Sequence, residues 1–275
     1  MKPQNILSVL GTLPSLVTPH LSLFSFGDSY TTTGFNASSA QPSLQNPMGN
    51  PRLGDGTSAD SINWVGYLTT LYNDTPVLSY NHAVYGATID NEIVSNVPHD
   101  LVYQISQSFR PHYCHASSES ESEPGAHWSS DAALFTIWIG INDIHFIYLR
   151  PDYAQYIDFV LHRYLTLLDT LHHCRARDFL VINIPPIHRT PKILLLAPWQ
   201  QRIYAAAIER YNHQLRPEIY DAWTFTSEVL DHSQEFGFVD STCMGEGCIW
   251  FDHLHPRSAF HRILAADLAV FLRGG

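Results

Sequence analysis

The chain has 275 residues, and its 26 acidic side chains against 15 basic ones give a formal net charge of -11. So few Lys and Arg residues exclude the phosphate contacts that nucleic-acid binding needs and the basic patch that holds a protein on an anionic membrane. A hydrophobic fraction of 45% excludes a disordered chain, and the length fits one domain with a sizeable core or with elaborated loops.

The N-terminus is typical of a secretory signal peptide. Lys2 precedes a mostly apolar stretch at residues 6–17, although no small-x-small cleavage site follows it. The alternative is a partly buried N-terminal extension. Glycosylation sequons at Asn36 and Asn73 favour export. We therefore expect residues 1–19 to be a signal peptide, residues 20–275 to be a single domain, and the protein to be a secreted monomer.

The hydrophobic pattern then predicts strands alternating with helices. Strands are expected at residues 21–26, 77–84, 132–139 and 179–184, and helices at residues 61–72, 98–109, 152–174, 198–230 and 256–272. Ser61 is expected to cap the first helix, and Pro256 to lie in the first turn of the last one. Residues 114–130 are polar and acidic and predict a surface loop. This alternation predicts an α/β fold with a parallel sheet covered by helices on both faces.

Four cysteines form an even set. Cys243 and Cys248 lie five residues apart in a Gly-rich loop, where a local disulfide can close. Cys114 and Cys174 remain as a second pair, and the sequence alone leaves their pairing open. No Cys-x-x-Cys spacing is present in the sequence, which disfavours a zinc site built from cysteines.

Reactive residues of a parallel α/β sheet gather at the carboxyl ends of its strands. Four segments of this chain are expected there: residues 26–29, 81–88, 138–143 and 251–256. They contain a serine, a glycine, an asparagine, and an aspartate followed three residues later by a histidine. These residue types together predict nucleophilic acyl chemistry.

A serine hydroxyl becomes a good nucleophile when a histidine removes its proton and a carboxylate orients that histidine. Ser29, His255 and Asp252 fit these three roles. The tetrahedral oxyanion then needs donors that are already in place. The backbone N–H groups of Ser29 and Gly86 and the side-chain amide of Asn142 are the expected donors.

These four blocks resemble the GDSL (SGNH) hydrolase superfamily. Its four characteristic residues match Ser29 in Gly-Asp-Ser, Gly86, Asn142 in Gly-x-Asn-Asp, and His255 in Asp-x-x-His-Pro, and the blocks span residues 26–256 in the family's order. The resemblance implies a three-layer sandwich and a carboxylic ester hydrolase that uses neither a metal ion nor another cofactor.

Residues 24–36, 63–65, 86–90 and 182–186 further resemble fungal secreted acetylesterases of carbohydrate esterase family 16. That resemblance implies an oligosaccharide ester of the plant cell wall as the substrate, most simply an acetyl ester. The chain departs from the pattern at Tyr85, where a second glycine is common, and in the acidic insertion at residues 117–123. Candidates for the substrate pocket are Tyr85, Trp250 and Asp28, the last of which also fits a structural role in its loop.

Other interpretations stay open at this point. Ser29 or Asp28 could cap a helix after the first strand, and His253 with His255 and Asp252 could bind a metal ion. Asn142 could belong to an Asx turn, and Asp143 is expected to hold loop backbone. Rival functions are a lipase or lysophospholipase for longer acyl chains and a non-catalytic carbohydrate-binding relative. The other histidines are expected to form a surface that titrates in mild acid.

Overall fold

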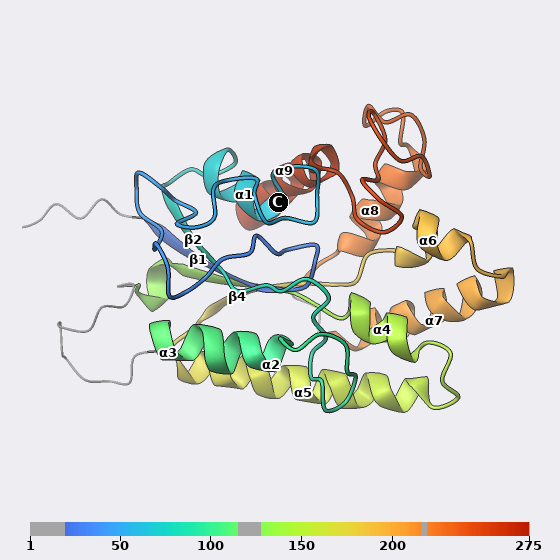
Figure 1. The fold of residues 1–275 in the computed structure, drawn as a ribbon, viewed down its shortest axis with the longest axis horizontal. Coiled ribbons are helices and arrows are strands. Elements are labelled where there is room, and N and C mark those ends of the chain that lie inside the picture. The colour runs from blue at the N-terminus through green and yellow to red at the C-terminus, as the bar shows by residue number, and fades with distance from the viewer. Residues whose placement is uncertain (1–19, 115–127, 216–218, 275) are drawn as a thin grey trace, which may run out of the picture.

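The computed structural model describes residues 20–114, 128–215 and 219–274. Its sheet has five parallel strands in the order β2-β1-β3-β4-β5 (Figure 1). The strands are β1 (Leu21–Gly27), β2 (Val77–Asn81), β3 (Ala133–Trp138), β4 (Asp178–Ile182) and β5 (Ile219–Tyr220). The parallel α/β sheet expected from the sequence is therefore confirmed, and the predicted signal peptide at residues 1–19 lies outside the described residues.

Helices cover both faces of the sheet. Figure 1 shows α1 (Trp64–Thr70), α8 (Ala222–Asp231) and α9 (Ser258–Leu272) above it and α2 (Leu101–Tyr103), α3 (Arg110–Tyr113) and α5 (Tyr153–His173) below it. A π-helical turn, Gln104–Phe109, joins α2 to α3. The remaining helices are α4 (Ile141–Ile147), α6 (Pro191–Leu194) and α7 (Pro198–Gln214), and both α4 and α7 pack against α5. Short 3₁₀ turns lie at Ser130–Ala132 and Ile187–Arg189.

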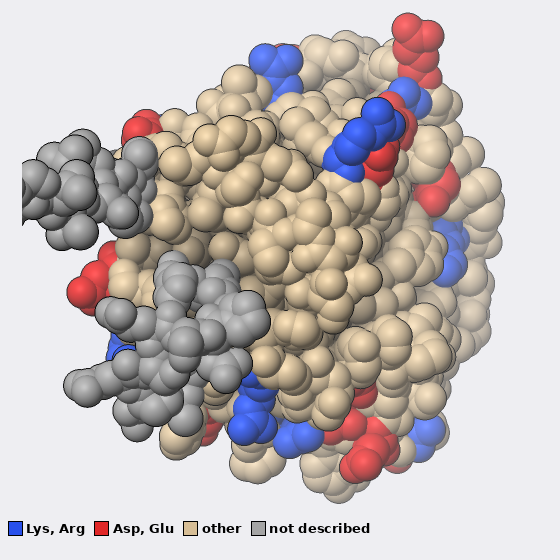
Figure 2. All heavy atoms as spheres, turned by 60° about the vertical axis from the view of Figure 1, so that its left-hand side comes forward, with Lys and Arg blue, Asp and Glu red and all other residues tan. Residues whose placement is uncertain are grey.

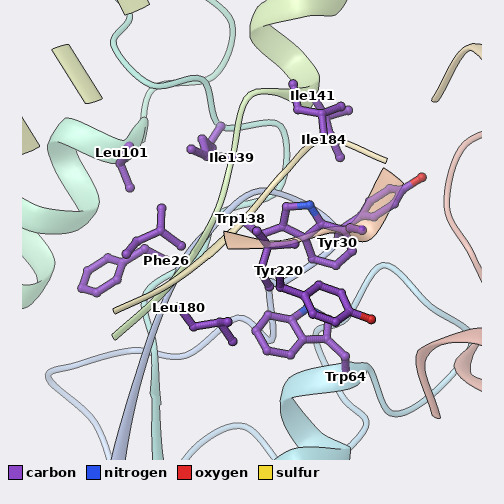
Figure 3. Packing of buried hydrophobic residues seen from close by; sticks show 14 of the residues in the cluster. Phe26, Tyr30, Trp64, Leu101, Trp138, Ile139, Ile141, Leu180, Ile184 and Tyr220 are labelled. Carbon is purple, nitrogen blue, oxygen red and sulfur yellow. The ribbon is translucent and has the colours of Figure 1, made fainter. Parts of the chain in front are cut away.

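The core is rich in aromatic side chains because β1 and β3 are buried on both faces. Phe24 stacks between Tyr80 and Phe135, with ring centroids 4.8 and 4.9 Å away. At the carboxyl end of the sheet, the Trp138 ring lies 5.4 Å from Tyr30 and 6.1 Å from Trp64 (Figure 3). This packing ties the end of β3 to α1 and to the segment that follows β1.

The two helices near the site begin at other residues than the sequence predicted. Helix α1 begins after Asn63, not Ser61, because the Asn63 side chain accepts a hydrogen bond from the Gly66 N–H at 3.3 Å. Helix α9 begins at Ser258, so Pro256 lies before the helix and not in its first turn. The chain is held extended there by a hydrogen bond from the Arg257 N–H to the Ile249 carbonyl at 2.7 Å.

The predicted helix at residues 198–230 is interrupted. Helix α7 ends at Gln214, the short strand β5 follows, and α8 begins after Asp221, whose side chain accepts from the Thr224 N–H. In the predicted loop at residues 114–130, residues 115–127 lie outside the described residues. Trp128 is packed against Phe24 and Phe135, at 5.4 and 5.3 Å, so this end of the segment belongs to the core.

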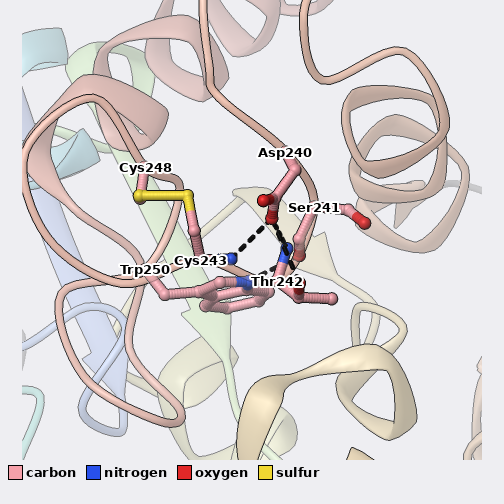
Figure 4. Close-up of a disulfide and its surroundings, with 6 residues drawn as sticks. All are labelled: Asp240, Ser241, Thr242, Cys243, Cys248 and Trp250. Atoms are coloured by element: carbon pink, nitrogen blue, oxygen red, sulfur yellow. Dashed lines mark hydrogen bonds between the residues drawn. A yellow bond between two sulfur atoms is a disulfide. The ribbon is translucent and has the colours of Figure 1, made fainter.

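Two disulfides are formed. Cys114–Cys174 links the ends of α3 and α5, and Cys243–Cys248 closes the Gly-rich loop (Figure 4). Among the helices that the structure describes, none has the length and apolar character needed to span a bilayer.

Charged side chains are sparse on the face shown in Figure 2 and lie mainly towards its edge. Among the described residues, His82, His255 and His261 are buried, and burial lowers the pKa of His82 and of His261 to about 3. These two side chains stay neutral in mild acid and are exceptions to the expected titrating surface.

Candidate active site

The nucleophile candidate follows the strand at which the sheet order reverses. Strand β1 lies between β2 and β3, so its carboxyl end borders the crevice where ligands of such sheets bind. Gly27 has a φ of +148°, and a Cβ there would run into the Trp138 carbonyl, so the turn requires glycine. The N–H groups of Thr31 and Thr32 donate to the Asp28 carbonyl, at 3.1 and 2.9 Å, and close a turn. No helix begins at Ser29, which removes the helix-capping interpretation.

Ser29, His255 and Asp252 form one hydrogen-bonded chain. His255 Nε2 lies 3.0 Å from Ser29 Oγ, and His255 Nδ1 lies 2.8 Å from Asp252 Oδ2. The other carboxylate oxygen, Oδ1, accepts from the backbone N–H groups of His255 and Leu254 at 2.8 and 2.7 Å. His255 is buried while Asp252 is half-exposed. The two residues are three apart in one tight turn, which sets their mutual geometry.

The charge on Asp252 decides the tautomer of His255. Partial burial raises the pKa of Asp252, but hydrogen bonds from the His255 ring and from the His255 and Leu254 N–H groups outweigh it, so the pKa lies below its usual value. An ionised carboxylate can only accept, so Nδ1 of His255 carries the proton. Nε2 is then the acceptor for the Ser29 hydroxyl, which is the arrangement that a general base needs.

Asn142 is hydrogen-bonded to Ala87, the residue after Gly86, beside the carboxyl ends of β2 and β3. The Asn142 side-chain nitrogen donates to the Ala87 carbonyl at 2.9 Å, which leaves its second N–H for a ligand. Gly86 has a φ of +78°, and its carbonyl accepts from the Asn96 side chain at 2.6 Å. A Cβ at Gly86 would lie 2.9 Å from Cγ1 of Val97, so this close turn also requires glycine.

Two buried carboxyl groups support the loops behind these residues. Asp143 accepts from the Ile89 N–H at 3.1 Å and so holds the loop that carries Gly86, as expected. Asp28 is fully buried, and its Oδ1 accepts from the Tyr30 N–H at 3.0 Å. Burial is the main cause that raises the pKa of each group to about 7, and in Asp28 the nearby Asp143 adds to it.

Of the three pocket candidates, only Tyr85 has the exposure of a substrate contact. Tyr85 is 58% exposed, and its ring centroid lies 5.3 Å from that of His255. Trp250 is 2% exposed and donates from Nε1 to the Ser241 carbonyl at 2.8 Å, beneath the loop closed by Cys243–Cys248 (Figure 4). The expectation that Asp28 and Trp250 contact substrate is therefore wrong: burial makes both of them supports of the site.

Gln104 is a supporting residue that the sequence interpretation missed. Its side-chain oxygen accepts from the Gly27 N–H at 2.9 Å, and its nitrogen donates to the Gly27 carbonyl at 2.8 Å. This one amide therefore satisfies both backbone groups at the end of β1. A signal was present, because Gln104 falls on the apolar stripe of its helix, between Leu101 and Ile105.

Two further side chains join the segment after β1 to other elements. The Asn63 amide donates to the carbonyls of Thr31 and Thr32, both at 2.9 Å, and the Tyr30 hydroxyl donates to the Leu254 carbonyl at 2.6 Å. The hydrogen bond from Tyr30 spans 224 positions and brings the loop that carries His255 beside the loop that carries Ser29.

The metal-site interpretation has no support in the described parts of the chain, where no group of three or more His, Cys, Asp or Glu side chains is arranged to hold a metal ion.

A family model described as GDSL-like lipase/acylhydrolase matches residues 23–268. The chain belongs to this GDSL family. An acetylesterase from Thermothelomyces thermophilus is 33% identical to the GDSL chain over 270 residues, which cover 92% of this chain and 88% of that protein. A GDSL esterase/lipase from Arabidopsis thaliana is 31% identical over 132 residues, covering 45% of this chain and 39% of that one.

Solved structures share the fold. A catalytic mutant of Axe2, an acetylxylan esterase from Geobacillus stearothermophilus, is 17% identical with a TM-score of 0.50, and the match covers 94% of each chain. Together with the family match and the curated relative, this likeness makes the GDSL chain a carboxylic ester hydrolase with the three-layer SGNH fold.

Proposed function

We propose that this GDSL esterase removes acetyl groups from carbohydrate esters of the plant cell wall through an acetyl-enzyme on Ser29. The observation that carries the mechanism is the continuous chain from Asp252 through His255 to Ser29, with contacts of 2.8 and 3.0 Å. The acetyl substrate is supported by the acetylesterase relative, which matches nearly the whole chain.

In the first half of the reaction, Ser29 Oγ attacks the ester carbonyl while His255 Nε2 takes the hydroxyl proton. The carbonyl oxygen becomes an oxyanion, which the N–H groups of Ser29 and Gly86 and the free N–H of Asn142 stabilise. The imidazolium of His255 is stabilised by Asp252. When the tetrahedral intermediate collapses, His255 gives its proton to the leaving sugar alkoxide, and the acetyl group stays on Ser29.

In the second half, a water molecule attacks the acetyl-enzyme, and His255 removes one of its protons. The same three donors hold the new oxyanion. Collapse releases acetate, and the proton on His255 returns to Ser29 Oγ. The chain from Asp252 through His255 to Ser29 is already hydrogen-bonded in the free protein, so the base and the nucleophile of this mechanism are organised before substrate arrives.

The mechanism is tested with purified Ser29→Ala and with Ser61→Ala as the matched control, because Ser61 is an exposed serine outside the hydrogen-bonded chain. We expect Ser29→Ala to lose hydrolysis of 4-nitrophenyl acetate and labelling by a fluorophosphonate, and Ser61→Ala to keep both. Wild-type hydrolysis by Ser29→Ala would refute the mechanism. Absence of labelling in the unmodified enzyme would instead favour a non-catalytic carbohydrate-binding relative.

The substrate class is tested separately, with acetyl, butyryl and decanoyl esters of 4-nitrophenol and with acetylated xylo-oligosaccharides. We expect the acetyl ester to be the best of the three and acetate to be released from the oligosaccharides. Rates that rise with chain length would contradict the acetylesterase and favour a lipase or lysophospholipase.

We also propose that the protein is secreted. The two disulfides suit an oxidising compartment, and the sequon residue Asn36 is exposed. Expression in a fungal host should place the protein in the culture medium, with an N-terminus that mass spectrometry shows to be trimmed near residue 20. Retention of the untrimmed, unmodified chain in the cell extract would contradict secretion.

A further inference from the structure

A cavity of about 390 Å³ is lined in part by Tyr85, whose ring centroid lies 5.3 Å from that of His255. Its walls come from three elements: the loop at residues 34–38, the segment after β2 at residues 82–85, and the helical run at residues 99–112. The volume is within the range of about 300–1,000 Å³ that is usual for ligand pockets. No step of the esterase mechanism uses this cavity.

The chemistry of the walls selects a neutral and polar ligand. Aromatic rings come from Phe35, Tyr85 and Tyr103, and amide or hydroxyl groups come from Gln107 and Ser108. Among the described lining residues, none is an Asp, Glu, Lys or Arg. The basic side chains that line it are His82, His99 and His112, so a phosphate or carboxylate would lack a permanently charged Lys or Arg as its partner. An acyl chain would bury these polar groups without hydrogen bonds.

A sugar ring has the complementary character. Its C–H faces pack on aromatic rings, and its hydroxyl groups hydrogen-bond to amides and hydroxyls around the ring edge. Within the described residues, neither the Tyr103 hydroxyl nor the Gln107 amide has a side-chain hydrogen-bond partner, so both are free to bind a ligand. The Tyr103 ring is stacked on His99 with centroids 3.8 Å apart and planes 9° apart, which holds it as a preformed platform.

The inner wall is fixed and uncharged. His82 is 3% exposed, its ring stacks on Phe26 at 5.3 Å, and its Nδ1 lies 2.7 Å from the Ser108 hydroxyl oxygen. Burial keeps the His82 ring neutral by lowering its pKa. The ring therefore sets the position of Ser108 without placing a charge in the cavity.

Tyr85 connects the cavity to the catalytic chain. Tyr85 lines the cavity, its ring lies 5.3 Å from the His255 ring, and the next residue, Gly86, is one of the proposed oxyanion donors. We propose that this cavity binds the sugar units next to the acetylated one, so that a neutral oligosaccharide runs over Tyr85 with its ester at Ser29. This inference rests on the proposed function and adds the site that selects oligosaccharides over small acetyl esters.

The kinetic test uses Tyr103→Ala and Gln107→Ala, which lie away from Ser29, with Trp199→Ala as the control for loss of an exposed aromatic on α7. On an acetylated xylotetraose we expect KM to rise about tenfold in Tyr103→Ala and by a smaller factor in Gln107→Ala, because a ring stack and a hydrogen bond are each lost. On 4-nitrophenyl acetate, kcat and KM of both variants should stay within about twofold of wild type. The inference would be overturned if both variants kept the wild-type kcat and KM on the oligosaccharide. It would also be overturned if KM rose for a decanoyl ester and not for the oligosaccharide.

A binding test separates this inference from the proposed function. Unacetylated xylotetraose is titrated into Ser29→Ala and into the double variant Ser29→Ala with Tyr103→Ala, and binding is followed by calorimetry. We expect binding in the first protein and at least tenfold weaker binding in the second. Equal affinities, or no binding to the first protein, would refute the cavity as a sugar site even if acetyl esters are hydrolysed. If Ser29→Ala binds xylotetraose but the unmodified enzyme hydrolyses no acetyl ester, the esterase proposal is refuted and the sugar site stands.

Discussion

The side-chain amide of Asn142 is fixed in place before any substrate arrives. One of its two N–H groups donates to the Ala87 carbonyl at 2.9 Å, so the direction of the other is already set. Such preorganisation gives an oxyanion donor its effect, because no reorientation is needed when the negative charge develops. The same bond ties Asn142 to the residue after Gly86, so two of the three proposed donors move as one unit.

The Asn142→Ala variant should lower kcat on 4-nitrophenyl acetate by about 10²–10³-fold, since one of three donors is lost. KM should change little because the ground-state carbonyl carries little charge. Asn46→Ala is a matched control, because this asparagine also donates to loop backbone, at the Gly49 carbonyl, and makes no hydrogen bond to the Gly86 loop. A kcat within about twofold of wild type in Asn142→Ala, with its circular dichroism unchanged, would show that the amide is not an oxyanion donor.

Asp28 gives a pH-dependent prediction at the same scale. Its pKa is about 7 in the folded chain against an ordinary value of 3.8, so the folded state holds the proton more tightly than the unfolded state. The resulting stability is complete below about pH 4 and is lost as the pH rises through about 7. Asn is a neutral isostere that cannot ionise. The stability of Asp28→Asn relative to wild type should therefore grow between pH 4 and pH 7, by up to ~4 kcal/mol, and then level off.

Chemical denaturation of both proteins at several pH values measures this difference. Asp240→Asn is the control, since backbone N–H groups of Thr242 and Cys243 lower the pKa of that exposed carboxyl, and its stability difference should therefore be flat above about pH 4. A stability difference for Asp28→Asn that is flat from pH 4 to pH 8 would contradict a buried, protonated Asp28.

At the scale of elements, the π-helical turn Gln104–Phe109 places Gln104 where it can pair with the end of β1. Both hydrogen bonds go to Gly27, two residues before Ser29, so a helix below the sheet fixes the serine loop. Gln104→Leu would leave the buried Gly27 N–H without its partner, while the Gly27 carbonyl keeps the hydrogen bond from the Val84 N–H at 3.1 Å. At about 1–3 kcal/mol for one unsatisfied buried group, we expect a loss of about 1–3 kcal/mol in the free energy of unfolding and a lower kcat.

Gln107→Leu on the same turn is the matched control, because Gln107 is exposed. Its free energy of unfolding should stay within about 0.5 kcal/mol of wild type in urea denaturation. Equal stability losses in the two variants would mean that Gln104 acts only through local helix propensity.

The elements that the sequence predicted well are those with a long or continuous apolar pattern, such as β1, β3, α5 and α9. The others lack such a signal for physical reasons. Strand β5 has only two residues, and α4 begins after Gly140 in a left-handed conformation, without a capping side chain. The site residues at the ends of strands follow from the fold class. The burial of Asp28 and Trp250 does not, because it depends on contacts between distant segments.

At the scale of the whole molecule, the proposed site joins the two ends of the domain. Ser29 and His255 are 226 positions apart, and several contacts besides their own hold the two segments together. The Ser258 N–H donates to Asp60 at 2.7 Å, and the Tyr67 hydroxyl lies 2.9 Å from the Ser258 hydroxyl. Packing of α9 against α1 therefore holds the segment that carries His255 close to the segment that carries Ser29.

The two disulfides should contribute unequally to the stability of the whole domain. Cys114–Cys174 closes a loop of 60 positions that contains β3, α4 and α5, whereas Cys243–Cys248 closes one of five. Loop-closure entropy in the unfolded chain predicts about 4 kcal/mol for the first and about 2 kcal/mol for the second. Replacing both members of a pair with Ala should therefore lower Tm more for Cys114 and Cys174, by about 8–16 °C against about 4–8 °C for the other pair.

Thermal unfolding of the two double variants, each measured with and without reductant, tests this order. Reductant should remove the remaining disulfide in each variant and bring their Tm values together. The Cys243 and Cys248 double variant should also keep most of its activity, because Asp240 still accepts from the Cys243 N–H in the loop over Trp250. Equal losses of Tm, or a larger loss for the short loop, would show that contacts in the folded state, and not chain entropy, determine what each disulfide contributes.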